Sequence, residues 1–178
     1  MVTGGGKEHP WQDVDHVPLW HGQPARGRGC CRTGGGLPEM APQSDCTDSP
    51  SGKLLQAFGE FNRGDWFECH ETLEDLWVGS EGELRCFYQG ILQLAVALHH
   101  WRNGNFGGAM HLLTSGADYL RRVRPVCQRI EVAALTAAAD TAREALGTLG
   151  PDRMADLSSA LVPRLRLAPA EPGGDPDG

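Results

Sequence analysis

The chain has 178 residues and a formal net charge of −7, which leaves room for one domain built around a single hydrophobic core. The negative charge is concentrated. Residues 60–83 contain eight acidic side chains and one arginine, which disfavours nucleic acid as a partner there. The longest apolar run, ILQLAVAL at 91–98, is too short to cross a bilayer, so we expect no membrane partner and a soluble, cytoplasmic protein.

Glycine and proline are concentrated at the two ends of the chain. Residues 1–50 hold 9 of the 24 glycines and 6 of the 12 prolines, and such segments bury too little apolar surface to offset the entropy lost on ordering. We therefore expect 1–50 and 168–178 to be disordered tails around a helical domain at 51–167. The N-terminal tail lacks the apolar run of a secretory signal, and Met40 is a second candidate for the start of translation.

The six cysteines show no C-x-x-C pair or other zinc-binding spacing. Cys30 and Cys31 are adjacent in the tail, whereas Cys69, Cys86 and Cys127 occur singly within helical patterns. We expect reduced thiols with mostly structural roles.

Apolar residues recur at intervals of three and four through the middle of the chain, which predicts an all-α fold. The segment AFGEFNRGDWFECHETL at 57–73 aligns without gaps on ALHHWRNGNFGGAMHLL at 97–113, so a helix–turn–helix unit occurs twice. Two units are too few for a solenoid. We expect a compact bundle of about six helices built on two helical hairpins, with helices at 51–62, 66–78, 84–102, 106–123, 130–148 and 151–162.

Both units turn at a glycine followed by a capping residue. Gly64 and Gly104 can adopt the left-handed conformation that ends a helix. Asp65 and Asn105 can then accept backbone N–H groups as N-caps of the next helix, and Asp65 with Glu68 has the spacing of a capping box.

The helix predicted at 66–78 divides into two sides. At 100° per residue, Glu68 points to solvent, while His70 lies at the edge of the apolar stripe. Glu74 follows His70 by one turn, and Glu71 is on the same flank. The stripe consists of Trp66, Cys69, Leu73, Leu76 and Trp77.

The helix predicted at 84–102 has little charge around its circumference, which is typical of a helix buried on most sides. Its two glutamines should therefore face another helix and require hydrogen-bond partners. Antiparallel pairing about the loop at 79–83 brings His70 and Glu74 to them, whereas His100 lies about 12 Å farther along the helix, too far to share an ion with His70. We define the polar cluster as Glu68, His70, Glu71, Glu74, Gln89, Gln93 and His100.

These segments resemble a bacterial and archaeal family called domain of unknown function 309. Its pattern runs F-N-x-G-x-[FY]-x-E-x-H-E-x-L-E-x-x-W, then Q-G-[LI]-[IL]-Q-L-A and G-N-x-x-G-A. The chain has FNRGDWFECHETLEDLW at 61–77, QGILQLA at 89–95 and GNFGGA at 104–109. The resemblance covers about 53–125 and implies a compact all-helical domain without an established activity, although members are sometimes labelled predicted metal-dependent hydrolases.

Three functional hypotheses follow for the polar cluster. In the first, His70 is held by Glu74 and Gln93, and the network only fixes the register of two helices. In the second, His70 and Glu74 bind a divalent metal (Zn, Mn or Fe), with Glu71 as a ligand or as general base for a bound water, so that His70 and Glu71 carry metal-assisted hydrolysis. The third is a non-catalytic module that binds a protein partner or a second copy of the chain. The sequence leaves open whether the protein is an enzyme.

Overall fold

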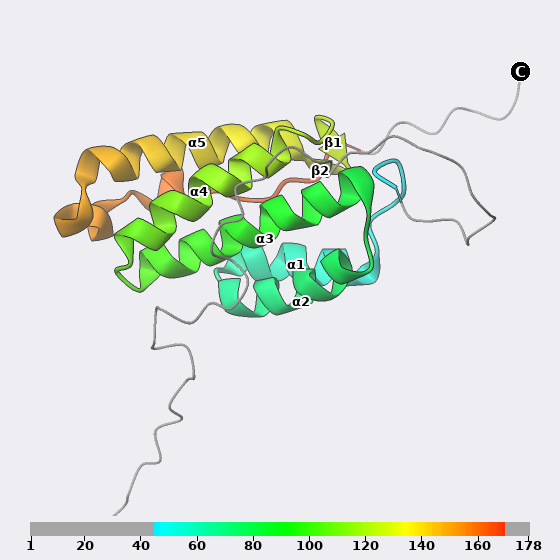
Figure 1. Cartoon of the computed structure of the whole chain (residues 1–178), viewed down its shortest axis with the longest axis horizontal. Helices are drawn as coiled ribbons and strands as arrows, with labels where there is room; N and C mark the ends of the chain where they lie inside the picture. Colours follow the sequence, from blue (N-terminus) through cyan, green and yellow to red (C-terminus); the bar gives the residue numbers. More distant parts are fainter. Residues whose placement is uncertain (1–44, 170–178) are drawn as a thin grey trace, which may run out of the picture.

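Five α-helices make up most of residues 45–169, the part of the chain that the computed structural model describes (Figure 1). A two-stranded hairpin and two short 3₁₀ segments follow the fourth and fifth helices. The elements are α1 (Gly52–Arg63), α2 (Trp66–Val78), α3 (Gly82–Arg102), α4 (Phe106–Leu120), β1 (Val126–Cys127), β2 (Ile130–Glu131), α5 (Val132–Leu149), η1 (Pro151–Asp156) and η2 (Ser159–Leu161). The predicted all-α fold is confirmed.

The predicted helices agree with the structure through α3 and then diverge. The fourth ends at Leu120 instead of 123, and the fifth begins at Val132 instead of 130, because residues 126–131 form the hairpin. The helix predicted at 151–162 is wrong: the chain forms η1, becomes extended at Leu157 and then forms η2. Only Met154 and Leu157 are buried there, so this segment lacks the apolar stripe that a longer helix needs.

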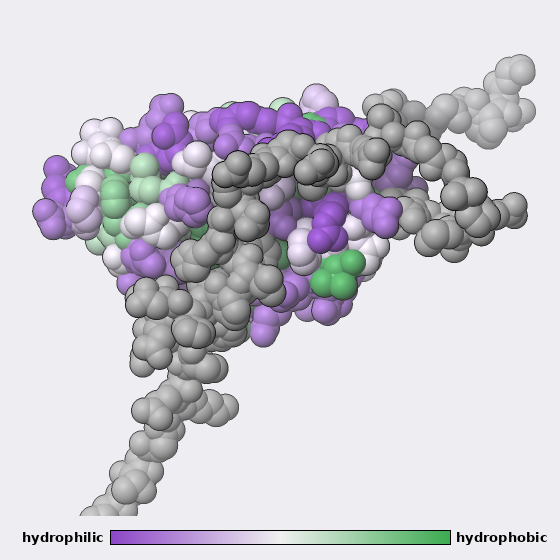
Figure 2. All heavy atoms as spheres, viewed as in Figure 1, coloured by the Kyte–Doolittle hydropathy of each residue, from purple (hydrophilic) through white to green (hydrophobic). Residues whose placement is uncertain are grey.

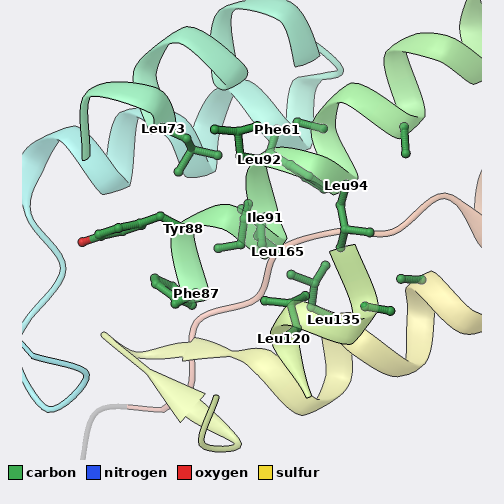
Figure 3. Close-up of a cluster of buried hydrophobic side chains, with 14 of the residues drawn as sticks. Phe61, Leu73, Phe87, Tyr88, Ile91, Leu92, Leu94, Leu120, Leu135 and Leu165 are labelled. Atoms are coloured by element: carbon green, nitrogen blue, oxygen red, sulfur yellow. The ribbon is translucent and has the colours of Figure 1, made fainter. Parts of the chain in front are cut away.

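The central position predicted for the third helix is confirmed. α3 packs against α2 on one side and α4 on the other, while α1 packs on α2 and α5 on α4 (Figure 1). Every residue of α3 from Cys86 to Ala95 is buried. The apolar layer around it includes Phe61, Leu73, Leu120 and Leu165, which come from segments far apart in sequence (Figure 3).

α3 and α4 cross at two glycines. A Cβ atom at Gly90 would stand 2.6 Å from both Cγ and Cδ2 of Leu120 and 3.1 Å from the carbonyl oxygen of Gly116. A Cβ at Gly116 would stand 2.9 Å from Cδ2 of Leu94. The backbones of the two helices therefore approach more closely than any larger residue would allow.

The predicted glycine turns are confirmed, but only one of the two predicted caps is. Gly64 and Gly104 have φ values of 86° and 76°. The N–H of Gly108 donates to Oδ1 of Asn105 at 2.8 Å, so Asn105 caps α4. Asp65 makes no side-chain cap, and the predicted capping box is wrong, because its carboxylate instead accepts a hydrogen bond from Nε of Arg63 at 2.9 Å.

The prediction of reduced cysteines is wrong for one pair. Cys46 and Cys127 form a disulfide across 81 residues, which links a residue before position 51 to the β1–β2 hairpin. Cys69 and Cys86 are buried and form no disulfide, as predicted for core thiols. Cys30, Cys31 and Met40, with most of both predicted tails, lie outside the described residues.

The β1–β2 hairpin that follows α4 contacts both ends of the described chain. Its turn residues Gln128 and Arg129 have φ values of 45° and 61°, which are unfavourable for residues other than glycine. The N–H of Gln128 donates to the carbonyl of Cys46 at 2.7 Å, and its side chain accepts a hydrogen bond from Tyr88 Oη at 3.0 Å. On the other side, Ile130 pairs with Leu167.

None of the described helices is both long and apolar enough to span a bilayer. Hydrophilic residues cover much of the described surface in the view of Figure 2.

Candidate functional site

The three glutamates of the polar cluster lie on the outside of α2. Glu68, Glu71 and Glu74 are all exposed. The inward orientation predicted for Glu74 is therefore wrong, because the apolar side of α2 is filled by its buried residues Trp66, Cys69, Thr72 and Leu73. Within residues 45–169, none of the three glutamates forms an ion pair with an arginine or lysine, whereas Asp75 of the same helix pairs with Lys53.

His70 lies at the edge of the core, as predicted. It is half-buried, and its ring stands beside the ring of Phe67, with 6.4 Å between their centroids. Burial lowers the pKa of His70 below its usual value, and the neighbouring carboxylates of Glu74 and Glu71 oppose that shift. The histidine therefore shares its surroundings with these two glutamates.

Gln89 and Gln93 are buried, with 5% and 8% of their surface exposed. Within the described residues, Oε1 of Gln93 has no hydrogen-bond partner. This oxygen therefore makes no hydrogen bond to His70, and the predicted contact of His70 with Gln93 stays a prediction. An acceptor buried in this way costs about 1–3 kcal/mol, so Gln93 is a site where a donor from outside would be favourable.

The neighbours of Gln93 on α3 show which way its side chain points. Leu92 faces the apolar layer that contains Leu73 of α2 (Figure 3), whereas Leu94 contacts Gly116 of α4. Gln93 is 100° from each, on the side of α3 opposite the core. It therefore lies along the outer line between α2 and α4.

The histidine of α3 that comes close to α2 is His99, which we did not include in the cluster. The rings of His99 and Phe67 have centroids 6.1 Å apart. Burial lowers the pKa of His99, as do the nearby charges of Arg102, His100 and His70, while Glu68 opposes the shift. Spacing could have identified it, because His99 continues the stripe of Tyr88, Leu92 and Ala95 that faces α2.

His100 faces α4, away from the glutamates. A Cβ atom at Gly108 would stand 2.9 Å from Cγ of the His100 ring. Nδ2 of Asn105 lies 3.2 Å from Nδ1 of His100. Because Oδ1 of Asn105 already accepts the Gly108 N–H, this amide nitrogen is the donor and His100 Nδ1 the acceptor, which requires a neutral ring. Burial lowers the pKa of His100, in agreement with that state. Its predicted separation from His70 is consistent with these contacts.

The geometry offers little to a metal ion. Among residues 45–169, no group of three or more histidine, cysteine, aspartate or glutamate side chains is arranged to hold one. His70 and Glu74 supply two potential donors, and structural zinc sites use four protein ligands while catalytic ones use three. The residues that the structure describes therefore do not fit a resident metal.

Several motif residues have a structural role. Nδ2 of Asn62 donates to the carbonyl of Leu165 at 3.0 Å, and Oδ1 of Asn62 accepts the Leu165 N–H at 2.9 Å. This pair of bonds attaches the end of α1 to the C-terminal segment. Glycine is required at position 64 by the positive φ, and at position 108 because a Cβ atom would collide with the ring of His100. The motif thus specifies helix junctions in addition to the polar cluster.

Comparison with known proteins agrees with the motif. Residues 54–112 match the family described as Domain of unknown function (DUF309). The predicted resemblance is thereby confirmed over a shorter span than 53–125. The DUF309 match runs from α1 into α4 and includes every residue of the polar cluster, together with His99.

Two curated relatives share this segment. One is the uncharacterized protein YpuF of Bacillus subtilis (strain 168), which is 41% identical over 58 residues, 32% of this chain and 33% of the relative. The other is an uncharacterized protein of Aquifex aeolicus (strain VF5), 36% identical over 53 residues, 29% of this chain and 16% of the relative. The chain thus covers a third or less of the length of either relative. No solved structure matches it.

Proposed function

We propose that the protein is a non-catalytic interaction module that binds a basic segment of a protein partner. The binding surface is the α2–α3 face, which we define as Glu68, Glu71 and Glu74 of α2 together with Gln93 of α3. The observation that carries the proposal comes from residues 45–169. There the buried Gln93 oxygen has no hydrogen-bond partner, and the exposed carboxylates on α2 form no ion pair with a lysine or arginine. Arginine and lysine side chains supply both the charge and the N–H donors that this surface needs.

The register of the two helices supports this grouping. α2 and α3 are antiparallel neighbours, and Phe67 is level with His99. Gln93 lies six residues before His99 on α3. Leu73 lies six residues after Phe67 on α2 and is followed by Glu74. Since Leu73 is buried and Glu74 exposed, a cation that approaches Glu74 from solvent reaches the level of Gln93. The acidic surface would also speed association with a basic partner.

A direct binding measurement tests the proposal. The full chain is titrated into a fluorescent synthetic peptide of alternating arginine and glycine, and anisotropy gives Kd; a glutamate–glycine peptide serves as the negative probe. We expect binding of the basic peptide alone, weakened by added salt. Glu71→Lys should weaken it by roughly 0.5–2 kcal/mol, because an exposed attraction becomes a repulsion. Glu144→Lys, the same charge change on α5, should leave Kd unchanged.

Two outcomes would refute the proposal. Equal effects of Glu71→Lys and Glu144→Lys would mean that only the net charge matters and that the α2–α3 face has no special part. Tighter peptide binding after replacement of Arg26, Arg28 and Arg32 by serine would mean that the chain's own arginines occupy the face, so that no partner is required.

Metal-assisted hydrolysis by His70, Glu71 and Glu74 stays a prediction of the sequence, and we do not adopt it. The described residues bring no third donor to His70 and Glu74, and both glutamates are exposed. Elemental analysis of protein purified without chelator addresses it directly. Stoichiometric zinc, manganese or iron that is lost in His70→Ala would favour hydrolysis over the interaction module.

A further inference from the structure

We infer that the seam between α3 and α4 contains a subsite for an arginine side chain, formed by Gln93 and Ser115. The inference rests on the proposed function, since it names the residue type that the basic partner inserts. Oγ of Ser115, like Oε1 of Gln93, is buried without a hydrogen-bond partner within residues 45–169. Two such atoms on facing helices are unusual, because nearly all buried polar groups are paired.

The helix register puts the two atoms at the same level. His100 of α3 contacts Gly108 of α4. Gln93 lies seven residues before His100 on α3, and Ser115 lies seven residues after Gly108 on α4. Seven residues are close to two full turns, so both side chains project from the same sides of their helices as His100 and Gly108. The contact of Leu94 with Gly116 independently gives the same register.

The third wall of the subsite is acidic. The contact of Phe67 with His99 puts Leu73 level with Gln93, and Glu74, the next residue of α2, is exposed. A cation on this line therefore meets a carboxylate on the α2 side and two neutral acceptors, Gln93 Oε1 and Ser115 Oγ, on the α3–α4 side. No lysine or arginine of the described chain forms an ion pair with Glu74.

Guanidinium fits this acceptor set better than ammonium does. Its five N–H donors are arranged in a plane, so one group can donate to acceptors on both sides at once, and it loses less hydration on burial. A lysine ammonium would keep its attraction to Glu74 but would be more costly to desolvate at the seam. The subsite should therefore distinguish arginine from lysine, which the exposed carboxylates alone would not do.

The competing explanation is a buried water molecule that bridges Gln93 and Ser115. Buried waters occur about once per 27 residues and satisfy such pairs. A water bridge would be independent of any peptide. Removing the polar atoms would then leave peptide binding unchanged and would lower stability, because the water would lose its partners.

The experiment compares the arginine–glycine peptide with a matched lysine–glycine peptide on the full chain. We expect the arginine peptide to bind roughly tenfold more tightly to the wild type, which corresponds to about 1.4 kcal/mol. Gln93→Leu and Ser115→Ala should each reduce that ratio towards one without lowering the melting temperature. Thr114→Ala, an exposed position next to Ser115, should preserve the ratio.

Failure of the subsite is distinguishable from failure of the proposed function. Equal affinities for both peptides, with both weakened by Glu71→Lys, would overturn the subsite and keep the interaction module. A preference for arginine that persists in Gln93→Leu and Ser115→Ala would also overturn it and would favour the bridging water. Binding of neither peptide would refute both.

Discussion

The close crossing of α3 and α4 makes a quantitative prediction for Gly90→Ala. The new methyl group would lie 2.6 Å from Cγ and Cδ2 of Leu120 and 3.1 Å from the Gly116 carbonyl oxygen. A rotamer change of Leu120 removes only part of this overlap, because Cγ is the first atom beyond its Cβ and the carbonyl is backbone. Overpacking costs about 1–3 kcal/mol, and three simultaneous close contacts put Gly90→Ala in the upper part of that range, at about 2–3 kcal/mol. Alanine in place of glycine returns about 1 kcal/mol of helix propensity. The net expectation is a loss of about 1–2 kcal/mol.

Chemical and thermal denaturation followed by circular dichroism measure this loss. For a folded domain of this size we expect the melting temperature to fall by about 4–8 °C. Gly107→Ala is the matched control on α4, because the nearest atom to its new Cβ would be Oδ1 of Asn105 at 4.0 Å. It should be neutral or slightly stabilising.

A double-mutant cycle decides whether the contact is the cause. Leu120→Ala alone should cost about 2–5 kcal/mol through the cavity it leaves, but distinctly less in the Gly90→Ala background, where its removal relieves the overlap. A Gly90→Ala protein as stable as the wild type, or costs that simply add in the cycle, would refute the close approach of the two helices.

Three other predictions concern contacts far apart in sequence. Cys46→Ser with Cys127→Ser opens a crosslink over 81 residues, and loop-closure entropy predicts a loss of about 4.5 kcal/mol in equilibrium denaturation; a change below about 1 kcal/mol would contradict it. Asn62→Asp replaces the donor to the Leu165 carbonyl by an acceptor and should cost about 1–3 kcal/mol, with faster proteolysis after α5; unchanged cleavage would count against this clamp. Because burial lowers the pKa of His100 from 6.5, the unfolded chain takes up this proton first on acidification. The contribution of His100 to the free energy of unfolding is thus full above about pH 6.5 and decreases below it, by at most about 1.4 kcal/mol per pH unit. If urea titrations gave the same dependence of that free energy on pH for His100→Gln as for the wild type, the role of His100 would be refuted.

The local features of the chain follow from its sequence because their causes are local. Apolar spacing of three and four residues predicted α1, α2 and α3, and the two glycine turns at Gly64 and Gly104 required only the preference of glycine for positive φ. The low charge of α3 indicated its central position. The predicted helix at 151–162 failed where the same spacing lacked a continuous apolar stripe.

The candidate site depended on contacts that no periodicity contains. Spacing showed that Gln93 is on an uncharged side of α3, but which helix covers that side, and whether its oxygen finds a donor, depends on how α2 and α4 pack. The same packing turned His99 towards α2 and left Glu74 exposed. The disulfide between Cys46 and Cys127 joins two isolated cysteines across 81 residues. A helix pattern specifies the direction of each side chain about its own axis, whereas its partner is chosen by the free energy of the whole packed core.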